Sequence, residues 1–390
     1  MRLSFAALAM ALVPLAPALA APFHTPIPAD QMTGKLNPGY HRPRDIDLAT
    51  PAQWAAFRAD LAAGRIDTLP SWQGSFAISG QSYDYTLVGG APADGGTTVI
   101  PTIIVPIRLT VSDYSVDGKH PLVLDGTKAV ASMLASPIFQ ASSYPAGNLQ
   151  FEDAMLRTEF PTAPNSWHTV FSPSVAAPID IVAPAGAVKV YQAKSGALLG
   201  VIVDYSIIDV GRDSPIPTYV RAASPQTYVI FVTYNAYENA ALGYHSDRID
   251  QKTHSATVYT YTSWLVGVDD LFKTPSPDAD TLAHEISEAT HDALGVSTTL
   301  LWGNAFRKNR CFQIYIETGD AVEDAPADVQ NWRQPVLRDG KEVFYTLQTE
   351  ALLPWFERQT PSSALGGTYS FPNTSALTSA APLTCVDRGS

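Results

Sequence analysis

Residues 281–295, "TLAHEISEATHDALG", begin like the His-Glu-x-x-His motif of zinc proteases, but Glu288 stands where the second histidine belongs. On a helix of 3.6 residues per turn, His284 and Glu288 lie one turn apart on the same side, so both could bind one ion. Glu285 would then be the general base that activates water on that ion. A carboxylate ligand is compatible with zinc, the metal we favour, and also makes Mn²⁺ or Ca²⁺ acceptable.

The same helix carries two more ionisable residues, His291 and Asp292, within an arc of about 120° that also holds the motif. Asp292 is a candidate further ligand, and His291 could serve instead. The opposite face is apolar, and we expect it to be packed; it consists of Leu282, Ile286, Ala289 and Ala293. The alternative is a solvated polar helix face that binds no metal.

Further ligands should come from other segments. "YIETGDAVED", residues 315–324, offers Glu317 and Asp320 at the end of an expected strand. A turn at Gly319, in which Asp320 bonds to the backbone, would explain the same residues without a metal. His245 in "LGYHSD" is another candidate, although a single loop histidine is more often a surface residue.

The elements that would position these residues indicate an α+β fold. Strand-like segments rich in β-branched and aromatic residues dominate residues 75–235, while the later part mixes helix and strand without regular alternation. We expect helices at 51–63, 150–160, 280–294 and 349–358, and strands at 97–111, 196–208, 227–237, 311–318 and 342–348.

The chain of 390 residues exceeds what one core usually supports, so we expect two lobes. A β-rich lobe with a mixed sheet would span 76–225, and residues 226–390 would form a lobe containing the metal helix. Residues 21–75 would be an N-terminal arm with a packing helix. Residues 1–20 are typical of a signal peptide cleaved after Ala20, which predicts a secreted or periplasmic protein.

Composition narrows the function classes. The net charge of −12 without a basic run disfavours nucleic-acid binding, and no later stretch approaches twenty apolar residues, so no membrane span is expected. Gly-x-Ser-x-Gly and Gly-x-Gly-x-x-Gly are both missing, which disfavours a serine hydrolase or nucleotide chemistry. Cys311 and Cys385 favour one disulfide in an oxidising compartment, worth about 4 kcal/mol; two free buried thiols are the alternative.

Several of these motifs together resemble the plant phosphate-induced, or EXORDIUM-like, secreted family. The family carries a strand ending in Tyr/Phe-His, then Gly-Val-Asp, a His-Glu-x-x-Glu helix followed by Asp or Asn, and Glu-x-Gly-Asp. The corresponding segments here occur in the same order: "GYH", "VGVDD" (266–270), "HEISEATHD" and "ETGD". Secreted bacterial proteins look more similar still, sharing "SPIF" (136–139), a helix like "FEDAMLRTEF" and an ending like "YTLQTEALLPWF".

The resemblance covers most of the chain after the signal segment and implies an extracellular protein with a zincin-like metal helix. His284 and Glu288 would be the core ligands of one divalent metal, with Asp292, Glu317 and His245 as candidates for the remainder. Asp320 would orient a ligand. The chain departs from the family at Ala293, where proline is common, and at Val322, where the plant proteins have cysteine, which implies a different disulfide. His291 matches no family histidine.

Two functions follow as expectations. The first is a secreted metal-dependent hydrolase, a metallopeptidase above all, in which Glu285 activates water and His245 or a nearby tyrosine steadies the oxyanion. Its substrate would be a peptide or a cell-wall polymer. The second is a noncatalytic extracellular or cell-wall protein whose ion, Ca²⁺ or Zn²⁺, is structural. The sequence does not indicate the oligomeric state.

Overall fold

The computed structural model describes residues 27–28, 45–46 and 50–385, apart from 193–197, 210–213, 240, 268–276, 307–310, 312 and 324. The expected signal peptide and most of the expected N-terminal arm lie outside the described residues. No helix within these ranges is long and apolar enough to cross a membrane.

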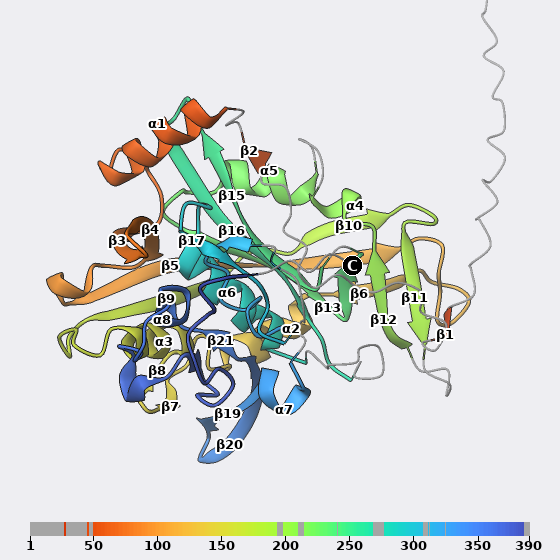
Figure 1. The fold of residues 1–390 in the computed structure, drawn as a ribbon. Coiled ribbons are helices and arrows are strands. Elements are labelled where there is room, and N and C mark those ends of the chain that lie inside the picture. The colour runs from red at the N-terminus through yellow and green to blue at the C-terminus, as the bar shows by residue number, and fades with distance from the viewer. Residues whose placement is uncertain are drawn as a thin grey trace, which may run out of the picture.

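The structure is a mixed α+β fold, with 22% helix and 39% strand, as the sequence predicts (Figure 1). Its largest sheet has eight strands and follows the order β10-β5-β13-β16-β15-β2, with β6 and β9 also pairing with β5. The strands of this sheet are β2 (Asp45–Ile46), β5 (Thr97–Val111), β6 (Leu122–Asp125), β9 (His168–Val175), β10 (Ile179–Ala183), β13 (Tyr228–Tyr234), β15 (Gly243–Asp250) and β16 (Ser255–Trp264).

Smaller sheets surround this one. A four-stranded sheet joins β1 (Ile27–Pro28), β11 (Val188–Gln192), β12 (Leu198–Val203) and β14 (Ala236–Glu238). The two-stranded sheets are β3–β4 (Ser71–Ile78, Gln81–Val88), β7–β8 (Ser142–Tyr144, Gly147–Leu149), β17–β18 (Thr298–Trp302, Gln313–Tyr315), β19–β20 (Asn331–Arg338, Lys341–Gln348) and β21–β22 (Glu350–Ala351, Ser370–Phe371).

The helices are mostly short. They are α1 (Pro51–Ala62), α2 (Thr127–Leu134), α3 (Phe151–Glu159), α4 (Ser206–Asp209), α5 (Pro215–Ala222), α6 (Asp280–Asp292), α7 (Ala327–Gln330) and α8 (Leu353–Phe356). Two 3₁₀ turns, Pro92–Asp94 and Leu365–Gly367, complete the regular structure of the described residues.

Several sequence-based expectations can be checked against these bounds. The expected strand 97–111 coincides with β5. Helix α1 begins at Pro51, and its N-cap is Thr50, whose hydroxyl accepts a hydrogen bond from the backbone N–H of Gln53. The expected strand 196–208 is too long, because β12 ends at Val203 and α4 follows. The expected helix 349–358 is also too long, since its first residues pair as β21 with β22 before α8 begins.

The eight-stranded sheet is covered on both faces. Along β13, Tyr228, Ile230 and Val232 belong to the apolar cluster that contains α6. The alternating residues Val229 and Phe231 belong to a second cluster, with residues of α4 and α5. The sheet also draws strands from both sides of residue 225, because β5, β6, β9 and β10 precede it and β13, β15 and β16 follow it. The two expected lobes therefore share one sheet.

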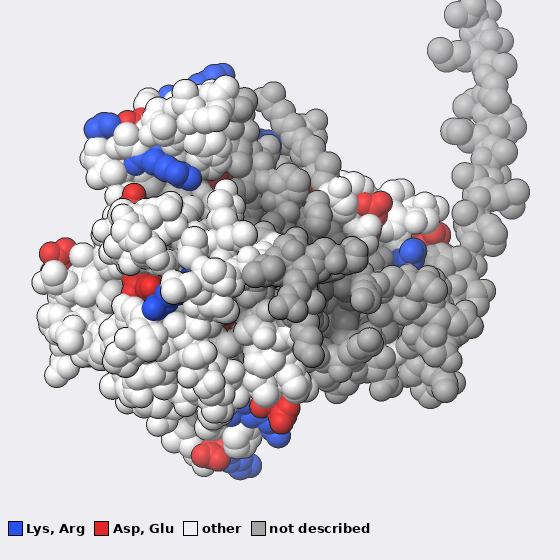
Figure 2. Space-filling model, in the orientation of Figure 1, with Lys and Arg blue, Asp and Glu red and all other residues white. Residues whose placement is uncertain are grey.

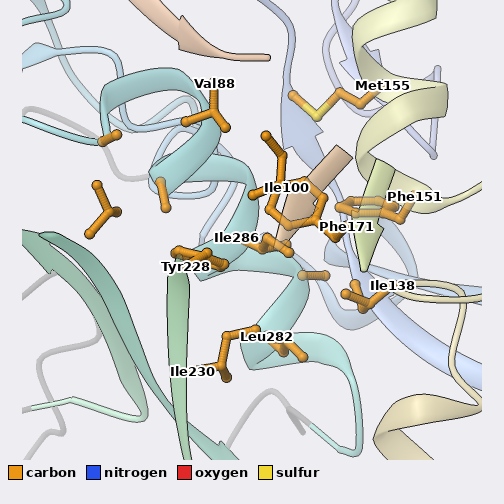
Figure 3. Close-up of a cluster of buried hydrophobic side chains, with 14 of the residues drawn as sticks. Val88, Ile100, Ile138, Phe151, Met155, Phe171, Tyr228, Ile230, Leu282 and Ile286 are labelled. Carbon is orange, nitrogen blue, oxygen red and sulfur yellow. The ribbon is translucent and has the colours of Figure 1, made fainter. Parts of the chain in front are cut away.

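Helix α6 lies in the interior of the molecule, against β4, β15, β16, β20 and α3. Its apolar stripe packs as expected: Figure 3 shows Leu282 and Ile286 facing Tyr228 and Ile230 of β13. Every residue from Asp280 to Asp292 is buried, including all the charged ones. The alternative of a solvated polar helix face is therefore wrong.

Acidic side chains are distributed unusually between surface and interior. Charged groups are sparse on the face shown in Figure 2. Among the described residues, aspartates and glutamates are repeatedly buried, whereas no lysine or arginine is. A buried carboxylate is stable only when it is hydrogen-bonded, paired with a cation or protonated, so the surroundings of each one decide its role.

The two cysteines are bonded to each other. Cys311 and Cys385 form a disulfide that closes a separation of 74 residues, with a Cα–Cα distance of 5.5 Å. The expected pairing is confirmed, and the alternative of two free thiols is wrong. The bond ties the C-terminal segment to the chain just before β18, and so to the segment that leads into Glu317.

Candidate metal centre

Three segments that are distant in sequence supply the side chains of one buried polar cluster. Helix α6 contributes His284, Glu285 and Glu288, and β15 contributes His245. The turn that follows β18 contributes Glu317 and Asp320. The structure therefore brings together six of the eight residues that the sequence suggested for metal binding, catalysis or ligand orientation, and leaves out Asp292 and His291.

The first group of potential ligands consists of His284, Glu288 and Asp320. His284 Nε2 lies 3.2 Å from Glu288 Oε1 and 3.9 Å from Asp320 Oδ1. The Asp320 backbone N–H also donates a hydrogen bond to Glu288 Oε1, at 3.2 Å, which holds the turn against the helix. Asp320 is thus placed among the potential ligands themselves, whereas the sequence suggested that it only orients one.

The second group consists of His245, Glu285 and Glu288. His245 Nδ1 lies 3.7 Å from Glu285 Oε2 and 3.4 Å from Glu288 Oε2. The other ring nitrogen, Nε2, lies 3.5 Å from Glu317 Oε2. Both nitrogens of His245 therefore face carboxylates inside the cluster, which disfavours the expected role of steadying a substrate oxyanion.

Glu317 and Asp320 both lie in positions that do not match their expected roles. Glu317, expected as a ligand, contacts the cluster through His245 Nε2 and lies outside both groups of converging ligand atoms. Asp320 lies inside one of them. Strand and turn patterns could not assign these two roles, because the difference depends on how the turn closes over α6.

The cluster is almost closed to solvent, and each group changes the proton affinity of its neighbours. Burial alone would lower the pKa of His245 and of His284, but the surrounding carboxylates raise both well above the usual value. Burial also acts to raise the pKa of Glu288, but His284 and His245 outweigh it and lower that pKa. Burial raises the pKa of Glu285. These opposite shifts leave Glu288 as the more strongly anionic carboxylate of the two.

Two glycines make the close approach of these segments possible. A Cβ atom on Gly319 would lie 2.3 Å from His284 Nδ1, and one on Gly243 would lie 2.9 Å from Glu285 Oε1. Real Cβ atoms do not come that close to other atoms, so a side chain at Gly319 would displace His284 and one at Gly243 would displace Glu285 and Thr281. Glycine at these two places therefore has a steric role, and it had not been assigned one from the sequence.

Asp292 is not part of the cluster, which corrects its assignment as a ligand. Its Oδ1 accepts a hydrogen bond from the Ser297 backbone N–H at 2.8 Å, so it stabilises the chain beyond the end of α6. His291 faces α3 instead: its Nδ1 lies 2.7 Å from the Ser287 carbonyl and its Nε2 lies 3.0 Å from Glu159 Oε2. A shared 120° arc was not enough to place all five ionisable residues at one site. Because α6 is enclosed on every side, residues within that arc face different neighbouring elements.

Glu350 is a neighbour of the cluster that the sequence did not suggest. It lies on the short strand β21, fully buried, and burial raises its pKa well above the usual value despite the nearby His284. No local pattern identifies it, since its position depends on the pairing of β21 with β22.

The donor set fits a divalent cation. Imidazole nitrogens and carboxylate oxygens suit Zn²⁺ or Mn²⁺. Comparison with known proteins adds no further constraint: no family model matches the chain, and no similar curated protein or solved structure was found.

Proposed function

We propose that this chain is a secreted metal-dependent hydrolase, a zincin-like metallopeptidase, with its metal held by His284, Glu288 and Asp320. The observation that supports the proposal is the convergence of these three ligand atoms, with Glu285 on the next residue of the same helix. The disulfide is compatible with an extracellular location. The resemblance of residues 244–245, 284–292 and 317–320 to the EXORDIUM-like family agrees with this proposal.

The divalent cation would polarise a scissile carbonyl and lower the pKa of a water molecule. The protein residues would do the rest. Glu285 would accept the proton of the attacking water, because its Oε1 lies 4.0 Å from His284 Nε2 and therefore beside the ligand set.

One observation favours a second candidate, a noncatalytic protein with a structural ion. The side chains of His284, Glu288 and Asp320 are all nearly inaccessible, and structural sites are typically closed. An ion there would fasten α6 to the turn of residues 316–323. In that case the Glu285 carboxyl group would not be needed for any reaction.

The two candidates differ in the consequence of replacing Glu285. We would incubate the Zn²⁺- or Mn²⁺-loaded protein with a peptide library and detect cleavage by mass spectrometry. Glu285→Gln should lower the cleavage rate by on the order of 10² to 10⁴, the usual contribution of a general base. Glu342→Gln, at an exposed position of β20, is the matched control and should cleave like the wild type. Equal cleavage by the wild type and Glu285→Gln would contradict the hydrolase proposal.

A further inference from the structure

The two ligand groups are spatially distinct, although they share one residue. His245 and His284 fall in different groups, and the ligand atoms within each group lie within 4.8 Å of one another. Two atoms bound to the same Zn²⁺ are at most about 4.3 Å apart, twice the ordinary bond length. A single ion can therefore draw together the atoms of one group, and the other group is left with its own histidine and carboxylates.

Glu288 connects the two groups through different oxygen atoms. Oε1 faces His284 and the Asp320 amide, whereas Oε2 faces His245. A carboxylate in this orientation can bridge two ions, one on each oxygen. Hydrolases with two metal ions place them about 3.5–4 Å apart, a separation that a bridging carboxylate spans.

The surroundings of His245 match those of a metal-binding histidine. Such a histidine commonly donates its second ring N–H to a carboxylate, which fixes the tautomer and the ring orientation. His245 presents Nδ1 to Glu285 and Glu288, and presents Nε2 to Glu317. The Nε2 atom is buried and makes no hydrogen bond of normal geometry in the described structure. The Glu317 carboxylate lies 3.5 Å from it.

The cluster gathers four carboxylates, those of Glu285, Glu288, Glu317 and Asp320, around two histidines in a nearly inaccessible volume. Ionised carboxylates this close repel one another, and cations bound between them relieve that repulsion. Each histidine has one carboxylate of its own group and shares Glu288 with the other, an arrangement that suits one cation beside each histidine.

We propose that the centre binds two divalent cations bridged by the Glu288 carboxylate. The first ion is held by His284 and Asp320 and the second by His245 and Glu285, while Glu317 orients His245. This inference rests on the metal site of the proposed function and extends it. Glu285 holds the second ion through Oε2, which faces His245, while Oε1 keeps its place beside His284 as the general base of the proposed function.

The number of bound ions and their magnetic coupling test this inference without an activity assay. The purified protein would be stripped with a chelator and titrated with Mn²⁺, and the bound metal would be counted by elemental mass spectrometry. Electron paramagnetic resonance of the same sample then reports whether the ions interact. We expect about two Mn²⁺ per chain with the spectrum of an exchange-coupled pair, as a shared carboxylate requires.

Variants assign the second ion to its residues. His245→Ala and the isosteric Glu285→Gln should each bind about one Mn²⁺, with the spectrum of an isolated ion. His120→Ala, at an exposed histidine paired with Asp117, is the control and should keep the coupled pair. Thermal unfolding of each variant shows whether it is folded, and Glu285→Gln serves if His245→Ala is not.

The outcomes separate the two proposals. One isolated Mn²⁺ in the wild type would overturn the second ion and leave the proposed function standing. Two ions without magnetic coupling would overturn the bridging role of Glu288. No bound metal at all would overturn the proposed function together with this inference.

Discussion

Two polar faces of helix α6 each place a histidine beside carboxylates and differ in how these groups are paired. One face presents His284, Glu285 and Glu288 to β15 and to the turn after β18, where carboxylates outnumber histidines. The other face presents His291 to Glu159 of α3 and places Thr290 beside Glu152 of the same helix. Both faces are buried, so burial alone does not distinguish them.

On the α3 side His291 and Glu159 satisfy each other, whereas the two oxygens of buried Glu152 make no hydrogen bond of normal geometry. His291 uses both ring nitrogens, Nδ1 with the Ser287 carbonyl and Nε2 with Glu159 Oε2. Glu159 Oε1 accepts a further bond from the Leu353 N–H at 2.6 Å. Burial raises the pKa of Glu152 to about 8, so that this carboxyl group is neutral over most of the physiological range.

The β15 side is arranged differently. The histidines approach carboxylates at 3.2–4.0 Å, and several carboxylate oxygens converge on one small volume. A histidine hydrogen-bonded to one carboxylate is a common structural pair, whereas a histidine nitrogen and several carboxylate oxygens within 4.8 Å of one another suit a cation. This difference in pairing, more than the presence of His and Glu, identifies the candidate metal face.

The largest effect on stability is expected on the α3 face. His291→Ala removes one member of a fully buried ion pair and leaves Glu159 without its histidine. Such a change typically costs about 3–5 kcal/mol of unfolding free energy. Urea unfolding measures the loss, and metal content measured on the folded fraction should not change. Loss of metal from folded His291→Ala would show that the two faces are not independent.

A smaller effect on stability, but a large one on metal binding, is expected for Gly319→Ala. The added methyl group would meet the His284 ring at 2.3 Å and displace it. We expect metal affinity to fall by about tenfold or more, as it does when ligand orientation is lost. Gly90→Ala, which meets the Thr98 hydroxyl at 2.6 Å elsewhere in the molecule, is the matched control. Equal metal affinity in both variants would contradict the placement of His284 in the site.

Asp292→Asn should cost about 1 kcal/mol, because it weakens the hydrogen bond from the Ser297 N–H that follows α6. Metal affinity, measured by competition with a chromogenic chelator, should equal that of the wild type. A tenfold loss of affinity would restore Asp292 as a ligand, as the spacing of the sequence had suggested.

Glu152→Gln should change the pH dependence of stability more than stability itself. The folded pKa of about 8 lies above the ordinary value of 4.5, so the folded state keeps a proton that the unfolded chain loses. The stability from this group is fully present below pH 4.5 and is lost as the pH rises through 8. Unfolding free energies measured from pH 5 to 8 should therefore fall less steeply in Glu152→Gln. Identical slopes in variant and wild type would contradict the raised pKa of Glu152.

Local patterns in the sequence were sufficient for part of this architecture. The α+β class, the bounds of β5, the N-cap of α1 and the disulfide follow from side-chain type, capping chemistry and cysteine count. Helical periodicity also identified α6 and the side of it that packs against β13. Most of these features depend on residues close to one another in the chain. The disulfide is the exception, and it could be predicted because the chain has only two cysteines.

The assignment of individual roles depended on tertiary contacts that no local pattern contains. Periodicity placed Asp292 near the motif, but its carboxylate accepts a hydrogen bond from the Ser297 backbone N–H instead. The exchange of roles between Glu317 and Asp320 follows from the turn that Gly319 allows against His284. Glu350 was missed because only the β21–β22 pairing brings it beside α6.

The most direct test is the metal content of purified protein after dialysis without chelator, measured by elemental mass spectrometry for three chains. These are the wild type, Glu288→Gln on the β15 side of α6, and Glu152→Gln as the same substitution on the α3 side. We expect bound metal in the wild type and in Glu152→Gln, and its loss in Glu288→Gln. Absence of metal from all three, or equal metal in all three, would contradict a metal centre at this face of the helix.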